Sequence, residues 1–517
     1  MRITAKQSIW LLILGYFVVF GVMTALRHYN FQTQAWDLAA FVQTFWNTAQ
    51  GRIMENNLEQ VHNHLGLHMS PWLLVLAPGY ALFQTPYYLL FIQTLALALG
   101  AWPLYLLAQK VLGRKWLSFV IVFSYLLYPS LHWANFYDFH EITFFVPLFL
   151  AAFYFVESKR WGWAGLFFAL AASVKEDAIL AVFFAGIYFL FLETNPKSEA
   201  LNSKQDQNSN LQNFKLLNLF RISNLGFRVL RNKKKAFGII IAVLALFYFL
   251  LAVKVFMPAL GGGVLRFDRY ANFGATPAAA IATAVTHPAL VAQTIFTPEK
   301  LFYLLILLFP VAFLPIFSPK TWILFLPGLP ENLLTNYNFQ FSGLYHYDSI
   351  LIPAVLIGSV YGLKNLIDRW PSASAREGGW RRERLFFWVI LIVAALGFLT
   401  RSPLSPKNFP ISYFQDTPQK LAYRSMVTLV PDGISVAANT NMVPHLAHRE
   451  YVYALGSEPK FMDMVLIDLG DSFGFKDEGA FQTYIDNYIQ SGFFDANLFE
   501  NRYLVITSKK LKLVPKP

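Results

Sequence analysis

The segment with the most chemical potential reads His-Trp-Ala-Asn-Phe-Tyr-Asp-Phe-His-Glu over residues 132–141. It directly precedes an apolar run, and ionisable groups at the edge of lipid usually have a function. We therefore interpret His140 and Glu141 as candidate catalytic groups and Asp138 as a candidate substrate ligand. The alternative is an aromatic belt at the membrane surface whose polar tips are simply satisfied.

Asp37 is a lone acid in the sequence Trp36-Asp37-Leu38. The apolar residues that follow recur at helical spacing, which predicts an amphipathic helix lying along the membrane. A carboxylate at its start can be a general base or a cation ligand. It can equally be an N-terminal helix cap. We rank Asp37 as the best single catalytic candidate.

His64 and His68 are four positions apart, so on a helix both imidazoles would lie on one face and could bind a metal. The intervening residues Leu65, Gly66 and Leu67 do not include the glutamate of the metalloprotease pattern. Hydrogen bonds to the backbone or to lipid headgroups are the simpler interpretation. We keep both histidines as candidate substrate ligands and leave a divalent cation open.

Further groups that could hold an anionic substrate stand in other segments between apolar runs. Lys175-Glu176-Asp177 is either a self-paired salt-bridge cluster or a site where the lysine neutralises a phosphate. Basic and aromatic residues in two later segments carry the same potential. The remaining candidate substrate ligands are Arg266, Arg269, Tyr345 and His346.

Composition places these groups in a membrane protein. The chain has 517 residues, of which 56% are hydrophobic and only 14% charged, a balance unsuited to a soluble protein. It contains no cysteine, which excludes disulfides and thiolate chemistry. The net charge of +12 comes from short segments beside apolar runs, so it indicates membrane topology and not nucleic-acid binding.

The hydrophobic pattern predicts an all-α polytopic protein with about eleven spans. Charged residues 175–177 split the stretch 161–192 into two short helices, because they would be costly at the centre of a bilayer. Residues 72–83 are too short for a span and predict an interfacial or re-entrant piece. The expected spans are 8–26, 88–107, 116–131, 142–156, 161–192 as two helices, 236–256, 301–317, 321–334, 349–366 and 385–400.

The distribution of Lys and Arg orients this threading. The basic residues concentrate on the side that holds the N-terminus, which predicts a cytoplasmic N-terminus and an extracytoplasmic C-terminus in the cell membrane. All ten histidines then lie on the outer side. Residues 1–400 form the expected membrane domain, with an outer first loop at 27–71 and a basic inner loop at 193–235. Residues 401–517 alternate short β-type runs with one helical stretch, which predicts a small extracytoplasmic α/β domain.

At these motifs the chain resembles domain-of-unknown-function family 2079, a group of uncharacterised prokaryotic membrane proteins similar to GT-C glycosyltransferases. The matching pieces cover nearly the whole chain. They are Trp36-Asp37-Leu38 with Gln43, His64 to Pro71, Asp138 to Glu141, Lys175 to Asp177, Tyr345 to Tyr347, and Asn441 to Arg449 with Asp468. The chain departs from the GT-C pattern because Leu38 and Ala39, not a second acid, follow Asp37.

The resemblance implies a membrane glycosyltransferase that moves a sugar from a polyprenyl-phosphate donor to an acceptor at the outer face. Asp37 would be the base, and Lys175, Arg266 or Arg269 would stabilise the leaving phosphate. The expected partners are the lipid-linked sugar and membrane lipid. Two alternatives stay open: a transporter or flippase of lipid-linked or small polar solutes, and a non-catalytic envelope assembly protein that binds a partner through residues 401–517.

Overall fold

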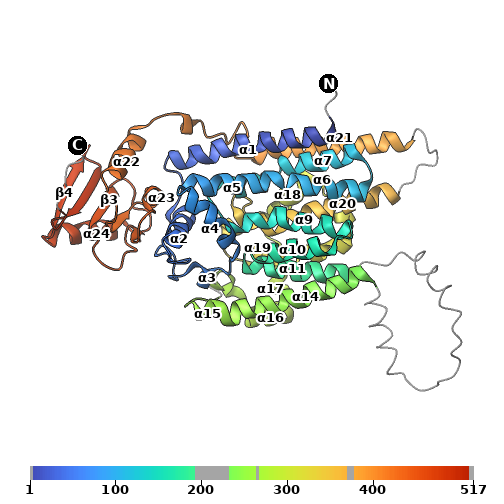
Figure 1. The fold of residues 1–517 in the computed structure, drawn as a ribbon, viewed down its shortest axis with the longest axis horizontal. Helices are drawn as coiled ribbons and strands as arrows, with labels where there is room; N and C mark the ends of the chain where they lie inside the picture. Colours follow the sequence, from blue (N-terminus) through green and yellow to red (C-terminus); the bar gives the residue numbers. More distant parts are fainter. Residues whose placement is uncertain (1–3, 192–231, 264–266, 370–377, 512–517) are drawn as a thin grey trace, which may run out of the picture.

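The computed structural model describes residues 4–191, 232–263, 267–369 and 378–511, with side chains from 382 in the last range. Roughly parallel helices form a bundle, and a small sheet domain sits at one end of it (Figure 1). The N-terminus lies at the opposite end of the bundle. The fold is therefore mostly helical, as predicted, with a small sheet near the C-terminus.

The long apolar helices form the body of the bundle. α1 begins with a capping box between Thr4 and Gln7, which satisfies the first free N–H groups of the helix. Five helical stretches in the described ranges are long and apolar enough to cross a membrane, and two bent pairs bring the total to as many as seven. The five are Ala5–Tyr29 (α1), Pro86–Leu112 (α5, α6), Lys233–Ala259 (α14, η4, α15), His346–Arg369 (η10, α20) and Arg382–Arg401 within α21 (Gly378–Arg401).

The predicted count of about eleven spans is not confirmed, and two expected spans are not continuous helices: residues 321–334 are divided between η8 (Pro319–Phe325) and α19 (Gly328–Leu334), and residues 301–317 are also broken. Residues 301–317 are not one helix: α18 (Pro298–Leu308) is followed by the short turns η6 (Phe309–Val311) and η7 (Leu314–Phe317). Pro310 and Pro315 remove backbone donors. Ala312 and Phe313 between the turns have the left-handed φ values 53° and 56°, which end the helix.

Two helical segments arise where the sequence predicted a loop or an ordinary span. Residues 267–295 form η5 (Phe267–Phe273), α16 (Pro277–Thr286) and α17 (Pro288–Ile295), with a 97° bend between the two α-helices. The expected span 116–131 is the bent pair α7 (Lys115–Leu126) and α8 (Pro129–Phe136). Pro288 and Pro129 each stand at the first position after the bend, where proline is tolerated.

The predicted break at the charged triplet is confirmed. α10 (Trp161–Ala172) ends before it and α11 (Glu176–Leu190) begins within it, so Lys175 lies in the connection. α11 then packs closely on α14 (Lys233–Leu251). A Cβ atom on Gly186 would come within 2.7 Å of the Gly238 carbonyl oxygen, so only glycine permits this approach.

Short elements gather at the end of the bundle that carries the C-terminal domain (Figure 1). The segment 72–83, predicted to be a short interfacial piece, contains the 11-residue helix α4 (Trp72–Leu82). α9 (Phe145–Glu157) follows the turn η2 as an ordinary helix. The other short elements of the membrane part are η1 (Ala35–Ala39), α2 (Ala40–Ala49), α3 (His64–Leu67), η2 (Glu141–Phe144), η8 (Pro319–Phe325), α19 (Gly328–Leu334) and η9 (Asn338–Phe341).

The C-terminal domain contains a five-stranded sheet of order β2-β1-β3-β5-β4. β1 (Val436–Ala438), β2 (Val452–Ala454) and β3 (Met464–Asp468) are parallel, whereas β5 (Tyr503–Ser508) runs antiparallel to β3 and to β4 (Phe494–Phe499). The β-type runs that the sequence predicts at 434–438, 451–454, 464–469 and 503–507 form β1, β2, β3 and β5, and the helical stretch predicted at 478–489 forms α24 (Glu478–Gln490). The sequence missed β4, η11 (Ile411–Phe414), α22 (Pro418–Thr428) and α23 (Val443–Leu446).

This domain is docked on the first outer loop and on the end of α1. The imidazoles of His28 and His445 stack with ring centroids 4.1 Å apart. The Gln43 amide donates to the carbonyl oxygens of Arg449 and Glu450 at 3.1 and 2.9 Å. Thr440 donates to Gln34 at 2.9 Å. Apolar residues of both parts belong to one hydrophobic core, so the domain is packed against the bundle and not only tethered to it.

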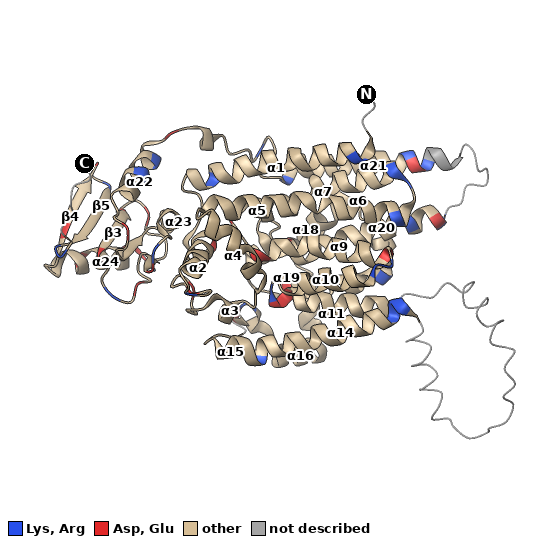
Figure 2. Cartoon of the chain, viewed as in Figure 1, with Lys and Arg blue, Asp and Glu red and all other residues tan. Residues whose placement is uncertain are grey.

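Lys and Arg gather at the end of the bundle opposite the C-terminal domain (Figure 2). Two ion pairs join helices there: Arg114 with Glu383 at 3.5 Å, and Lys234 with Glu157. Most of the predicted basic loop 193–235 lies outside the described residues. The basic residues of the described part thus mark one end of the bundle.

Candidate functional site

Asp37 lies in a π-helix, η1, whose first four N–H groups need partners other than the helix itself. Single π-turns are uncommon and occur often at functional sites. Asp37 is not the N-terminal cap, because Gln34 occupies that position. The segment after it is helical as predicted, although residues 40–45 are buried within the protein and do not lie on its surface.

The 137–141 segment is fixed by buried polar contacts on both sides. Asp138 has a φ of 53° and accepts hydrogen bonds from Arg27 Nε at 3.1 Å and from the Gln34 backbone at 2.8 Å. Gln93 of α5 (Pro86–Leu99) donates to the Asp138 carbonyl and accepts from the His140 backbone N–H at 2.7 Å. The Asp138 carboxylate is therefore buried and engaged by partners within the chain, and it fixes the position of the segment.

These contacts bring His140 and Tyr137 to Asp37. Nε2 of His140 is 3.1 Å from Asp37 Oδ1, and the Tyr137 hydroxyl donates to Oδ2 at 3.1 Å. The Asp37 side chain is 23% exposed, whereas His140 is 7% exposed. The carboxylate is thus held by two partners yet is still open to an incoming molecule.

Aromatic groups continue the cluster beyond His140. The imidazole of His346 stacks on that of His140 with centroids 3.7 Å apart. Tyr345 packs edge-on against Tyr137 at 4.5 Å. The segment 345–346, more than 200 positions from His140 in sequence, thereby lies beside His140 and Tyr137.

His64 is fully buried and forms an ion pair with Glu59, Nδ1 to Oε1 at 2.9 Å. Burial opposes the charged imidazole, but Glu59 and then Glu141 more than offset this and raise the pKa of His64 above its ordinary value. The pKa of Glu59 is lowered: burial opposes this direction, and His64 outweighs it. The ring of Phe41 separates His64 from His140, at centroid distances of 5.2 and 6.2 Å.

The charged triplet 175–177 is not self-paired. Lys175 Nζ lies 3.4 Å from Glu141 Oε1, and the Glu141 side chain is 2% exposed. Glu176 accepts from His68 Nδ1 at 2.9 Å and from the Met69 backbone at 3.0 Å. The triplet therefore ties the first outer loop to α11 and to η2.

Two further charged groups, Glu331 and Arg269, lie near Lys175. Glu331 of α19 is within electrostatic reach of Asp177, Lys175 and Arg269. The Arg269 guanidinium lies over the Tyr337 ring at 4.2 Å and near the Tyr347 ring at 5.6 Å. No carboxylate within the described ranges pairs with it at ion-pair distance. The predicted substrate ligand Arg266 lies outside the described residues.

Several buried polar atoms of this cluster have no hydrogen-bond partner in the described chain. They are His64 Nε2, His140 Nδ1, Glu141 Oε1 and His346 Nδ1. The contact of Glu141 Oε1 with Lys175 is an ion pair without hydrogen-bond geometry. Buried polar groups are rarely left unpaired, so these four atoms are available to a polar ligand or to water.

The structure does not favour a metal at His64 and His68. α3 ends at Leu67, and the two ring centroids are 6.0 Å apart, with each Nδ1 committed to a different glutamate. In the part of the chain described by the structure, no group of three or more histidine, aspartate or glutamate residues could hold a metal ion.

The structure brings most of the predicted site residues into one continuous cluster, which we call the outer cluster. Asp138 stands beside it in a positioning role. Sequence reasoning did not single out Gln93, Glu59 or Glu331. An amide within an apolar span was the available signal for Gln93. The outer cluster comprises Asp37, Glu59, His64, His68, Tyr137, His140, Glu141, Lys175, Glu176, Asp177, Arg269, Glu331, Tyr345 and His346.

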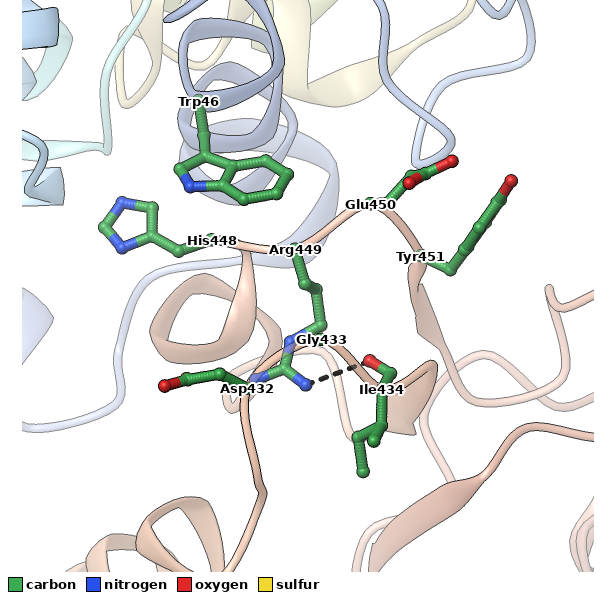
Figure 3. Close-up of a pocket in the computed structure, with 8 residues that line it drawn as sticks. All are labelled: Trp46, Asp432, Gly433, Ile434, His448, Arg449, Glu450 and Tyr451. Atoms are coloured by element: carbon green, nitrogen blue, oxygen red, sulfur yellow. Dashed lines mark hydrogen bonds between the residues drawn. The ribbon is translucent and has the colours of Figure 1, made fainter. Parts of the chain in front are cut away.

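A cavity of about 440 Å³ lies apart from the outer cluster, between α2 and the C-terminal domain (Figure 3). Its walls are Trp46 and the segments 432–434 and 448–451. None of the predicted catalytic or substrate-binding residues lines it. This cavity is therefore separate from the outer cluster.

Apolar helices, a docked sheet domain and a buried polar cluster at one end of the bundle define a helical integral membrane protein. The chain belongs to the family described as predicted membrane protein (DUF2079), whose model matches residues 27–497. The predicted family membership is thus confirmed, and the match spans both the bundle and the C-terminal domain. No curated protein matches the chain.

Proposed function

We propose that this protein is an integral membrane glycosyltransferase that moves a sugar from a polyprenyl-phosphate donor to an acceptor. The observation that carries the proposal is the Asp37 carboxylate, held at 3.1 Å by both His140 and Tyr137 and left partly exposed. A fixed, accessible carboxylate within a buried polar cluster is suited to general-base chemistry. The GT-C-like architecture and the predicted count of about eleven spans belong to this proposal.

The proposed transfer is an inverting displacement at C1 of the donor sugar. The acceptor hydroxyl gives its proton to Asp37, and its oxygen forms a bond to C1 of the donor sugar. The bond from C1 to the phosphate oxygen breaks, and its electron pair leaves with the polyprenyl phosphate. A single base on the acceptor side is the arrangement that inversion requires.

The surrounding groups supply the other requirements of this step. Lys175 and Arg269 are the cations of the outer cluster, and they can stabilise the negative charge on the departing phosphate. The unpaired atoms of His64, His140, Glu141 and His346 offer partners to sugar hydroxyls. The aromatic pair Tyr137 and Tyr345 provides a surface for the sugar ring.

The transfer is proposed to occur at the outer face of the cell membrane. The basic end of the bundle then faces the cytoplasm, and the C-terminal domain lies outside. The chain has no cysteine, so single substitutions report topology without background. Arg160→Cys should react with an impermeant maleimide only in opened cells and Gln482→Cys in intact cells; the reverse pattern would overturn the orientation.

Reconstitution in proteoliposomes tests the reaction and separates it from transport. A panel of radiolabelled polyprenyl-phosphate hexoses is supplied with a membrane extract as the source of acceptors. Labelled product with equimolar release of polyprenyl phosphate is expected. Movement of intact donor across the bilayer without product would contradict transfer and establish a transporter instead.

A further inference from the structure

The cavity between α2 and the C-terminal domain contains an arginine, Arg449, that forms no ion pair within the described ranges; Asp432 attracts it only from beyond ion-pair distance. The Arg449 side chain is buried, and no carboxylate in the described ranges lies at ion-pair distance from it. The two acids in the cavity wall, Asp432 and Glu450, point away from the guanidinium (Figure 3). A buried charge without an ion-pair partner is costly, and the more distant Asp432 does not offset the cost of burial, so this position favours an anion from outside the chain.

The guanidinium is fixed in place but only partly used. Nε donates to the Leu446 carbonyl at 2.6 Å, and Nη1 donates to the carbonyls of Pro431 and Ile434 at 3.3 and 3.2 Å. Nη2 makes no hydrogen bond within the described chain and is not among its buried unpaired atoms. Its two N–H groups are therefore oriented in advance and free for a ligand.

The opposite wall is aromatic. Trp46 projects from α2 toward the segment 448–450 (Figure 3). Arg52 covers the Trp46 ring from 5.3 Å and so fixes its orientation. A volume of about 440 Å³ is far larger than one phosphate requires and falls in the range of pockets for small organic ligands.

We propose that this cavity is a binding site for an anionic sugar, either a sugar phosphate or a sugar acid. The anionic group pairs with Nη2 of Arg449, and the ring lies against Trp46. Phosphate and carboxylate both accept the charge-assisted hydrogen bonds that an arginine guanidinium donates. This proposal does not depend on the role of Asp37, because none of the outer-cluster residues lines the cavity.

Binding at this site is linked to docking of the C-terminal domain. Gln43 of α2 holds the backbone of Arg449 and Glu450, and the Tyr80 hydroxyl lies 2.7 Å from His448 Nε2. The cavity has walls from both parts and exists only when they are together. A ligand that binds there therefore stabilises the docked state.

The test is calorimetric titration of the full chain in phosphatidylcholine nanodiscs. The probes are glucose 1-phosphate, glucuronate, glucose, inorganic phosphate and dihexanoyl phosphatidate. We expect both anionic sugars to bind and glucose to bind at least about tenfold more weakly, the factor expected for one charge-assisted hydrogen bond. Any of three results would overturn the proposal. Glucose could bind as tightly as the anionic sugars, phosphatidate or inorganic phosphate could bind most tightly of all the probes, or neither anionic sugar could bind.

Variants locate the binding. Trp46→Ala and Arg449→Gln should each weaken binding of the anionic sugars about tenfold or more. Trp163→Ala, which removes an exposed indole on α10, should not. Arg449→Gln also loses contacts to backbone carbonyls, so Trp46→Ala, which leaves these intact, keeps the proposal falsifiable if the arginine variant does not fold. Binding unchanged in Trp46→Ala would contradict the site, and binding should persist in Asp37→Asn.

Discussion

Nε2 of His140 lies 3.1 Å from Oδ1 of Asp37, although 103 positions separate the two residues in the chain. The contact joins the first outer loop to the segment before α9. It depends on buried supports, because Gln93 holds the His140 backbone and Arg27 holds the neighbouring Asp138. Asp37, the proposed general base, is thus positioned by two parts of the membrane domain.

Tyr137→Phe should slow the proposed transfer about tenfold to a hundredfold while leaving the fold intact. The variant removes the hydroxyl that donates to Asp37, a hydrogen bond to a charged group worth about 1.5–3 kcal/mol. The measurement is the rate of sugar transfer at saturating donor. Tyr154→Phe, on α9 outside the outer cluster, is the matched control. An unchanged rate in Tyr137→Phe would show that this hydroxyl has no part in the reaction.

Lys175→Gln should destabilise the protein strongly, because it leaves the Glu141 carboxylate buried without its cation. Breaking a buried pair in this way costs about 3–5 kcal/mol. The double variant Lys175→Gln with Glu141→Gln should recover much of the loss. Lys364→Gln, which breaks an exposed pair with Asp368, should cost less than about 1 kcal/mol. Thermal unfolding in detergent compares the variants, and additive losses in the double variant would refute the coupling.

The pair Glu59 and His64 should give the protein a stability maximum in mildly acidic solution. The pKa of His64 is raised, so its contribution is complete below the unfolded value of about 6.5 and is lost as the pH rises through the folded value. The pKa of Glu59 is lowered, so its contribution is complete above about 4.3 and is lost as the pH falls through the folded value.

Glu59→Gln should therefore lower the unfolding temperature most between about pH 4.5 and 6.5. Well above the folded pKa of His64 the contribution of the ion pair disappears. Glu55→Gln is the matched control, because Glu55 pairs with the exposed His62 and should change little. A pH-independent difference between wild type and Glu59→Gln would contradict the ion pair.

Gln43→Leu should loosen the C-terminal domain from the bundle. Its amide donates to two carbonyls of the segment 449–450 and accepts from the Asn57 backbone at 3.0 Å. Losing buried partners of this kind costs about 1–3 kcal/mol. Hydrogen exchange should become faster over 448–454 and stay unchanged in α20 (Leu351–Arg369). The control Gln482→Leu, an exposed position in α24, should leave both regions unaffected.

The sequence predicted the elements better than their contacts. Hydropathy located α1, α14 and α20, and the cost of burying charge predicted the break at Lys175. The prediction of one continuous span over 301–317 was wrong for a local reason. Pro310, Pro315 and two residues with left-handed φ values interrupt the helix, although the hydropathy of the segment is uniformly apolar.

The outer cluster shows the same limit. One-sided placement of the histidines and acids predicted that such a cluster exists. It did not predict that Lys175 would form its ion pair with Glu141 and not with the adjacent Glu176 or Asp177. It also did not predict the ion pair between Asp138 and Arg27. Those choices follow from tertiary packing between residues more than 30 positions apart, which periodicity does not carry.

The most direct test of the central claim is the rate of polyprenyl phosphate release by Asp37→Asn in proteoliposomes with donor and acceptor. Asparagine keeps the shape of the side chain but cannot take the acceptor proton. We predict a rate at least about a hundredfold below wild type. Asp416→Asn, at an exposed ion pair with Arg424, should keep the full rate. Transfer by Asp37→Asn at the wild-type rate would remove Asp37 from the role of base and contradict the proposed mechanism.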